Sequence, residues 1–90
     1  MITTARRLVV HGRVQGVFYR DWTVQFARSL GLRGWVENRP DGTVAAHLEG
    51  EPQAIDRIVA AMHDGPPQAA PTRIDQQEAE VEKLEKFERR

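Results

Sequence analysis

The sequence predicts an α+β fold in which two helices cover one face of an antiparallel sheet of four to five strands. Three observations lead to this prediction. Short segments alternate between apolar and polar residues, as strands do, and two longer segments repeat their apolar residues at helical spacing. The segments follow one another as β-α-β-β-α-β, the order of ferredoxin-like α/β sandwiches. Ninety residues are too few for two independent cores, so we expect one domain over residues 1–90.

The first strand and the first helix are predicted in the N-terminal third of the chain. Residues 7–14 alternate, and Leu8, Val10 and Val14 share one face. A helix is expected over residues 21–30 because apolar side chains recur at helical spacing and Gly31 follows as a helix-ending residue. The apolar residues of this helix are Trp22, Phe26, Ala27 and Leu30.

A hairpin and a second helix follow. Residues 33–38 and 43–50 are predicted to pair because residues 39–42 (Arg-Pro-Asp-Gly) have the composition of a turn. The second helix is predicted to begin at Pro52 and to stop at residues 65–67 (Gly-Pro-Pro). We expect a last strand over residues 73–82, although Val81, Leu84 and Phe87 would also suit a helix. The apolar stripe of the second helix is Ile55, Ile58, Val59 and Met62.

This order of elements predicts where functional residues meet. The first two strands are joined through a helix, in a crossover expected to be right-handed, so they should run parallel. The loop after the first strand and the end of the second strand then leave the sheet at the same edge. Residues 12–20 and Asn38 should therefore converge.

Charge is balanced over the chain but divided between its halves. The sequence has 13 Lys plus Arg against 13 Asp plus Glu, which argues against a general polyanion binder. Residues 1–39 contain seven Arg and only two acidic residues, whereas residues 40–90 carry a matching excess of acid. We expect no nucleic-acid partner and a local positive charge in the N-terminal half.

Several classes of site are excluded by composition. The chain has no Cys, so disulfides, thiolate nucleophiles and Cys-based zinc sites are not available. His11, His47 and His63 lack paired spacing and are expected to be surface or structural residues, so no metal site is predicted. No apolar run exceeds residues 58–62, so we expect no membrane segment and a cytoplasmic protein.

Residues 12–20 (Gly-Arg-Val-Gln-Gly-Val-Phe-Tyr-Arg) have the chemistry of an anion-binding loop. A glycine-containing loop that enters a helix can direct backbone N–H groups toward one point, where the helix dipole also favours an anion. Arg20 would lie at that point, and its planar guanidinium matches two oxygens of a phosphate. The alternative is that Gly12 and Gly16 only relieve backbone strain and that Arg20 is a solvated residue.

Asn38 is the second candidate. Its amide both donates and accepts, so it can hold a water molecule without titrating. An Asn before a Pro-Asp-Gly turn also has a purely structural explanation. The expected convergence with Arg20 favours the functional one.

Taken together, these residues resemble the acylphosphatase family. Residues 12–20 are similar to its first signature, Gly-x-Val-Gln-Gly-Val-x-Phe-Arg, with Tyr19 in place of the usual Phe. Residues 34–38 (Gly-Trp-Val-Glu-Asn), followed by Gly42, Val44 and Gly50, are similar to the second signature. The resemblance covers essentially the whole chain.

The resemblance implies hydrolysis of a small-molecule acyl phosphate to a carboxylate and inorganic phosphate, with no metal and no cofactor. Phosphate would be both a product and a competitive inhibitor. Arg20 would bind the phosphate and Asn38 would position the attacking water. The phosphate-binding loop would be the backbone N–H groups of Gln15, Gly16, Val17, Phe18 and Tyr19.

This chain departs from the family pattern at Glu37, at Tyr19, whose hydroxyl needs a partner if buried, and at Arg89, where an apolar residue is common. Two alternatives stay open: a non-catalytic anion-binding module, and an accessory module that handles carbamoyl phosphate. An RNA-binding module is disfavoured because the outer faces of the predicted strands lack aromatic residues. A monomer is expected.

Overall fold

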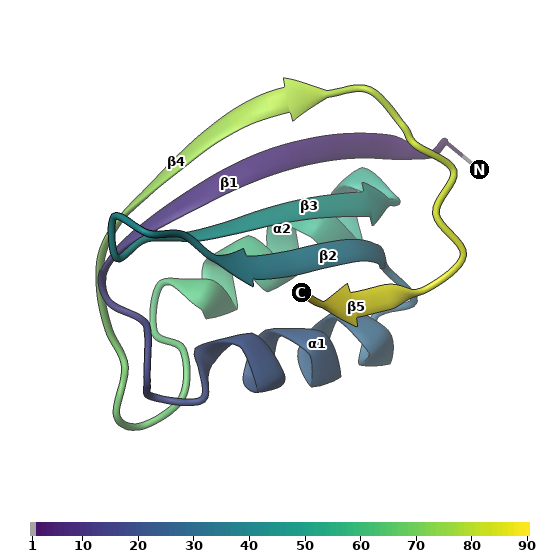
Figure 1. The fold of residues 1–90 in the computed structure, drawn as a ribbon. Helices are drawn as coiled ribbons and strands as arrows, with labels where there is room; N and C mark the ends of the chain where they lie inside the picture. The colour runs from purple at the N-terminus through teal and green to yellow at the C-terminus, as the bar shows by residue number, and fades with distance from the viewer. Residues whose placement is uncertain (1) are drawn as a thin grey trace.

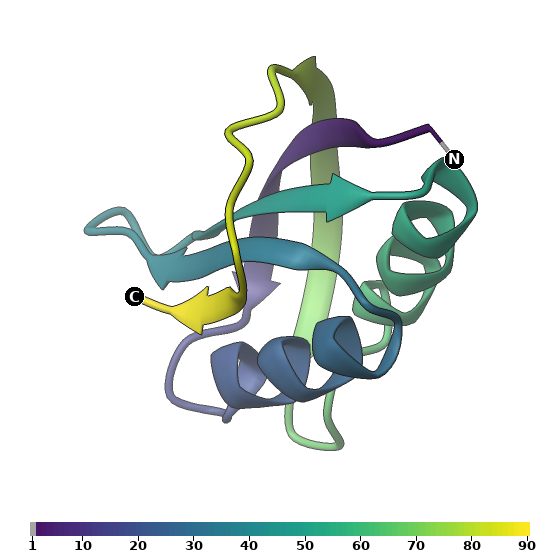
Figure 2. The same cartoon turned by 90° about the vertical axis from the view of Figure 1, so that its right-hand side faces the viewer.

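The computed structural model describes residues 2–90 and contains a five-stranded sheet with both helices on one side (Figure 1, Figure 2). The strand order is β4-β1-β3-β2-β5. The elements are β1 (Thr4–Arg13), α1 (Tyr19–Ser29), β2 (Arg33–Asn38), β3 (Val44–Gly50), α2 (Pro52–Met62), β4 (Ala70–Ala79) and β5 (Phe87–Arg89). This arrangement confirms the predicted α+β fold.

Three boundaries differ from the prediction. β1 covers residues 4–13, which is earlier than expected at both ends, because Thr4 to Val10 all pair with β3. α1 begins at Tyr19 and ends at Ser29, because Phe18 adopts a left-handed conformation (φ 64°) and its carbonyl accepts the first helical hydrogen bond from Trp22. β4 covers residues 70–79 because the chain then leaves the β1 edge.

The sheet is mixed, which corrects the expectation of a purely antiparallel one. β5 runs parallel to β2, with Gly34 opposite Phe87. Phe87 is buried in the core and supplies most of the apolar contact of this short strand. Arg28 also donates a hydrogen bond from Nη2 to the carbonyl of Phe87 at 3.0 Å. β5 is therefore tied to both the sheet and α1.

The core lies between the sheet and the helices. Leu8 and Val10 of β1 meet the predicted stripe of α2, and all six of these side chains are buried. Tyr19 at the start of α1 is also buried, and its hydroxyl donates a hydrogen bond to the carbonyl of Met62 at 2.6 Å. The hydroxyl thus has the partner that the sequence required.

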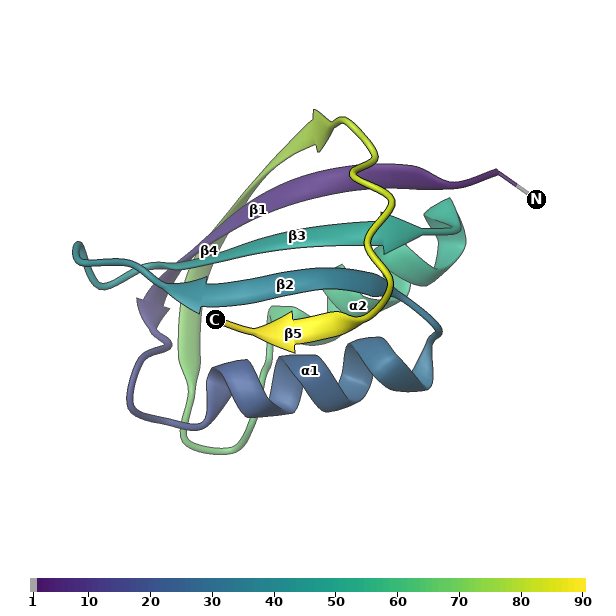
Figure 3. The ribbon, with the colours of Figure 1, turned by 45° about the vertical axis from the view of Figure 1, so that its right-hand side comes forward.

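The opposite face of the sheet carries a buried polar cluster. Arg7 Nε donates to His47 Nδ1 at 2.8 Å, so the proton of a neutral His47 ring lies on Nε2, which is 2.8 Å from Glu49 Oε2. Glu49 also accepts hydrogen bonds from the backbone N–H groups of Glu82 and Leu84. These contacts fasten residues 80–86, which we call the strap, across β3 and β2 on the way to β5 (Figure 3).

Substitution of Gly34 tests how closely the backbones of β2 and β3 approach each other. Gly34 has φ 144°, and an added Cβ would overlap the carbonyl oxygen of His47 on β3. We expect Gly34→Ala to lower the free energy of unfolding by about 3 kcal/mol or more. Gly42→Ala is the matched control, because Gly42 also has positive φ (91°) but open space around it. It should cost only about 1–2 kcal/mol. Equal losses in urea unfolding would contradict the close pairing.

Glu49 should make stability depend on pH. Burial raises the pKa of Glu49, but hydrogen bonds from His47 and the strap outweigh burial and hold it below its ordinary value. A lowered pKa stabilises the fold above the unfolded value of about 4.3, and this contribution is lost as pH falls through the folded value. We expect Glu49→Gln to cost about 1–3 kcal/mol at pH 7 and progressively less below about pH 4.3.

Urea unfolding at several pH values measures this difference. Glu78→Gln, at an exposed position of β4, removes the same charge and should leave the pH profile unchanged. A Glu49→Gln deficit that stays constant with pH would contradict an ionised Glu49 in the folded state.

Candidate active site

The loop between β1 and α1 is fixed by its own apolar side chains. Val14 and Val17 are buried in the core, and their packing holds the backbone between them in place. Gly16 has φ 72° with open space beside its Cα, and Phe18 has φ 64°. The side chain of Phe18 is 74% exposed. The loop therefore presents backbone, rather than bulky side chains, at Gly16.

The backbone N–H groups of residues 15–19 are free to bind an anion. Within residues 2–90 the structure gives them no hydrogen-bond acceptor, and α1 has no side-chain cap at its N-terminus. Unpaired N–H groups at the start of a helix carry a partial positive charge. A phosphate oxygen is a suitable partner for such groups.

Gln15 joins this loop to the β2–β3 turn. Its side-chain Nε2 donates to the carbonyl of Arg39 at 2.8 Å and to the carbonyl of Thr43 at 2.9 Å. Asp41 stabilises the same turn by accepting hydrogen bonds from Thr43 N and Oγ1, which hold the pKa of Asp41 below its ordinary value. The loop between β1 and α1 and the end of β2 are therefore one connected unit.

Asn38 ends β2 beside this loop. Its Oδ1 is buried and has no hydrogen-bond partner among the residues that the structure describes. A buried acceptor without a partner costs about 1–3 kcal/mol, so such an atom calls for a functional explanation. Asn38 lines the same pocket as Gly16 and Arg20.

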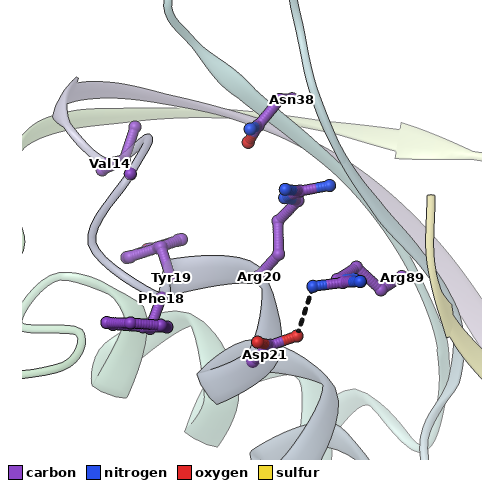
Figure 4. Close-up of a pocket in the computed structure, with 8 residues that line it drawn as sticks. Val14, Phe18, Tyr19, Arg20, Asp21, Asn38 and Arg89 are labelled. Carbon is purple, nitrogen blue, oxygen red and sulfur yellow. Dashed lines mark hydrogen bonds and ion pairs between the residues drawn. The ribbon is translucent and has the colours of Figure 1, made fainter.

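Arg20 reaches the pocket from the first turn of α1. Its Nη1 donates to the backbone oxygen of Arg90, which follows β5, at 2.8 Å. In Figure 4 this guanidinium lies between Asn38 on one side and Asp21 and Arg89 on the other. Arg20 thus lines one pocket together with Gly16 of the loop.

The pocket has a volume of about 240 Å³, below the roughly 300–1,000 Å³ of pockets that enclose drug-sized ligands. It brings together most of the predicted site residues. Gln15 and Val17 do not line it, because the Gln15 side chain bonds to the turn and Val17 points into the core. The lining residues are Val14, Gly16, Phe18, Tyr19, Arg20, Asp21, Asn38 and Arg89.

Two charged residues of the wall were not predicted. Asp21 Oδ1 and Arg89 Nη1 form an ion pair at 3.0 Å. The sequence marks Arg89 as a departure from an apolar position, but only the parallel pairing of β5 with β2 shows that it reaches the site. Tyr19 has a structural role, since its buried hydroxyl donates to the carbonyl of Met62, and burial raises the pKa of that hydroxyl.

The histidines and acidic residues are the candidate metal ligands within residues 2–90. This part of the chain contains no group of three or more His, Cys, Asp or Glu side chains that could hold a metal ion. His11 pairs with Asp75 at 2.9 Å and His47 lies in the buried cluster, so both have structural partners. No helix within these residues has the length and apolar character needed to cross a membrane.

A family model, curated proteins and a solved structure match this chain and share one family. A family model described as acylphosphatase matches residues 6–89. An acylphosphatase of Thermococcus kodakarensis is 46% identical over 80 residues, which cover 89% of this chain and 88% of that protein. One of Acidovorax sp. is 44% identical over 85 residues, covering 94% and 88%. The solved structure of an acylphosphatase from Coxiella burnetii has a TM-score of 0.94, with 36% identity over 98% of this chain and 93% of the other.

The link made by Gln15 can be tested by phosphate binding. We expect Gln15→Ala to reduce the rise in melting temperature caused by inorganic phosphate, because the loop loses two hydrogen bonds to the turn. The variant should itself lose about 1–2 kcal/mol of stability. Gln77→Ala, which removes an exposed side chain on β4, is the matched control. An unchanged phosphate effect in Gln15→Ala would show that the link does not shape the loop.

Proposed function

The chain belongs to the acylphosphatase family, and we propose that Arg20, Asn38 and the loop N–H groups divide the work of its reaction. The protein hydrolyses acyl phosphates to a carboxylate and inorganic phosphate. An acyl phosphate already has a good leaving group. The protein therefore needs mainly to position water and to neutralise charge on the phosphoryl oxygens.

The phosphoryl group is bound by the loop and by Arg20. The backbone N–H groups of residues 15–19 and the guanidinium of Arg20 donate to its oxygens. These donors are fixed before substrate binds, so they stabilise charge in the transition state without reorganising. Support comes from the unpartnered N–H groups and from the pocket that Arg20 lines together with Gly16 of the loop.

Asn38 positions the nucleophile. Its Oδ1 accepts a hydrogen bond from a water molecule, whose lone pair is then aimed at phosphorus. The new bond forms between the water oxygen and phosphorus as the bond from phosphorus to the acyl oxygen breaks. The carboxylate leaves, and a phosphoryl oxygen of the substrate accepts the proton of the water. No strong protein base is required.

The buried, unpartnered Oδ1 of Asn38 carries this proposal. A purely structural Asn in a turn would use its side-chain oxygen to bond the backbone. Here that oxygen faces the pocket that also contains Arg20. The turn is instead stabilised by Asp41 and Gln15, so Asn38 is not needed for it.

The proposal also covers the domain organisation, the oligomeric state and the cellular location of the protein. We expect residues 1–90 to act as a single domain, because one core joins the sheet to both helices, and to act as a monomer. We also place it in the cytoplasm, since a chain without Cys makes no use of an oxidising compartment. Inorganic phosphate should compete with substrate for the loop. Gel filtration and cell fractionation test these points.

Arg20→Ala and Asn38→Ala test the two roles directly with benzoyl phosphate and EDTA in the assay. We expect wild-type activity to persist in EDTA. Asn38→Ala should lower kcat by about 10²–10³-fold, and Arg20→Ala by at least as much, because each removes a preorganised donor or acceptor of the transition state. Arg57→Ala, at an exposed position of α2, is the control for Arg20 and should keep full activity.

Melting curves establish whether each variant is folded. Full activity in a folded Arg20→Ala or Asn38→Ala variant would contradict its assigned role. Stabilisation of the wild type by phosphate with no turnover of benzoyl phosphate would indicate a non-catalytic anion-binding module instead.

A further inference from the structure

Arg89 extends the pocket beyond the phosphate-binding elements. It lies on β5 opposite Val36 of β2, and its side chain is 52% exposed. The pocket that it lines also contains Arg20 and Asn38. None of the roles assigned above uses Arg89, although it is a second guanidinium in the wall of a small site.

Arg89 lies on the side of the pocket away from Asn38 (Figure 4). In-line attack requires the water and the leaving oxygen to lie on opposite sides of phosphorus. Asn38 holds the water, so the acyl group must extend away from Asn38. In Figure 4 the Arg89–Asp21 pair lies on the far side of the Arg20 guanidinium from Asn38. An acyl chain that extends away from Asn38 would run toward this pair.

Arg89 can exchange its present partner for a substrate anion. Its only hydrogen-bond or ion-pair partner within residues 2–90 is Asp21, through Nη1. Both side chains are about half exposed, and ion pairs of this kind are weak. Asp21 uses one of the five N–H donors of the guanidinium, so a carboxylate can bind the remaining donors or displace Asp21.

We propose that Arg89 is a specificity-determining residue that favours acyl phosphates whose acyl chain carries a second anionic group, such as a carboxylate. Asp21 keeps the guanidinium at the pocket until that group arrives. This inference rests on the proposed function, because it assumes that the phosphoryl group is bound by the loop and Arg20.

A pair of substrates with equal chain length tests the proposal. Succinyl phosphate carries a terminal carboxylate, whereas butyryl phosphate has the same four carbons and no charge at that end. The measured quantity is the ratio of kcat/KM for succinyl phosphate to kcat/KM for butyryl phosphate. Because both values come from one preparation, any loss of folded protein cancels.

We expect Arg89→Gln to lower this ratio about tenfold, the effect of losing one charge-assisted hydrogen bond. Arg73→Gln removes the same charge from exposed β4, at the opposite edge of the sheet, and should leave the ratio unchanged. A ratio that is the same in Arg89→Gln and wild type, or that falls equally in both variants, overturns the proposal.

The outcome also separates this inference from the proposed function. If the wild type hydrolyses butyryl phosphate and Arg89→Gln does not change the ratio, only the specificity role fails. If the wild type hydrolyses neither substrate, the proposed function fails, and the inference fails with it.

Discussion

The active site depends on the register of β3 with its two neighbours. Val44 lies opposite Val10 of β1 on one side and opposite Asn38 of β2 on the other. This register brings the end of β1 level with the end of β2, so that the loop after β1 meets Asn38. A slip of one residue would turn Asn38 to the other face of the sheet. Val44 is fully buried, so such a slip would also expose this core residue. The stability of the core therefore maintains the register that places Asn38 at the site.

Electrostatic contacts join the two oppositely charged halves of the sequence. Arg6 pairs with Asp56 at 3.0 Å and Arg7 with Glu82 at 2.7 Å, both across the boundary between the halves. Exposed pairs of this kind contribute little stability individually. These pairs change where positive charge remains on the molecule, because acidic residues of the C-terminal half neutralise Arg side chains that lie away from the pocket. Arg20 differs, since within residues 2–90 it forms no ion pair with an Asp or Glu side chain, and its Nη1 donates to the backbone oxygen of Arg90.

Sequence patterns predict most of the fold and of the candidate site. The features that they miss depend on contacts between residues far apart in the sequence. Alternation and helical spacing identify the paired strands and both helices, and the crossover rule predicts that the loop and Asn38 converge. β5 has a single buried apolar residue, Phe87, so no periodicity reveals its parallel pairing. The reach of Arg89 into the pocket depends on that pairing. The link from Gln15 to the turn is equally hidden, because it joins residues far apart in sequence through a side chain.

Burial of Val14 and Val17 has a thermodynamic consequence for substrate binding. Ordering a flexible loop costs about 1–2 kcal/mol of conformational entropy for each residue. In this protein that entropy is lost during folding, because the two valines pack into the core and fix the backbone between them. An incoming phosphoryl group meets N–H groups that are already in place, and its binding free energy is not reduced by ordering them. Folding thus contributes to the affinity for substrate by ordering the loop before the substrate binds.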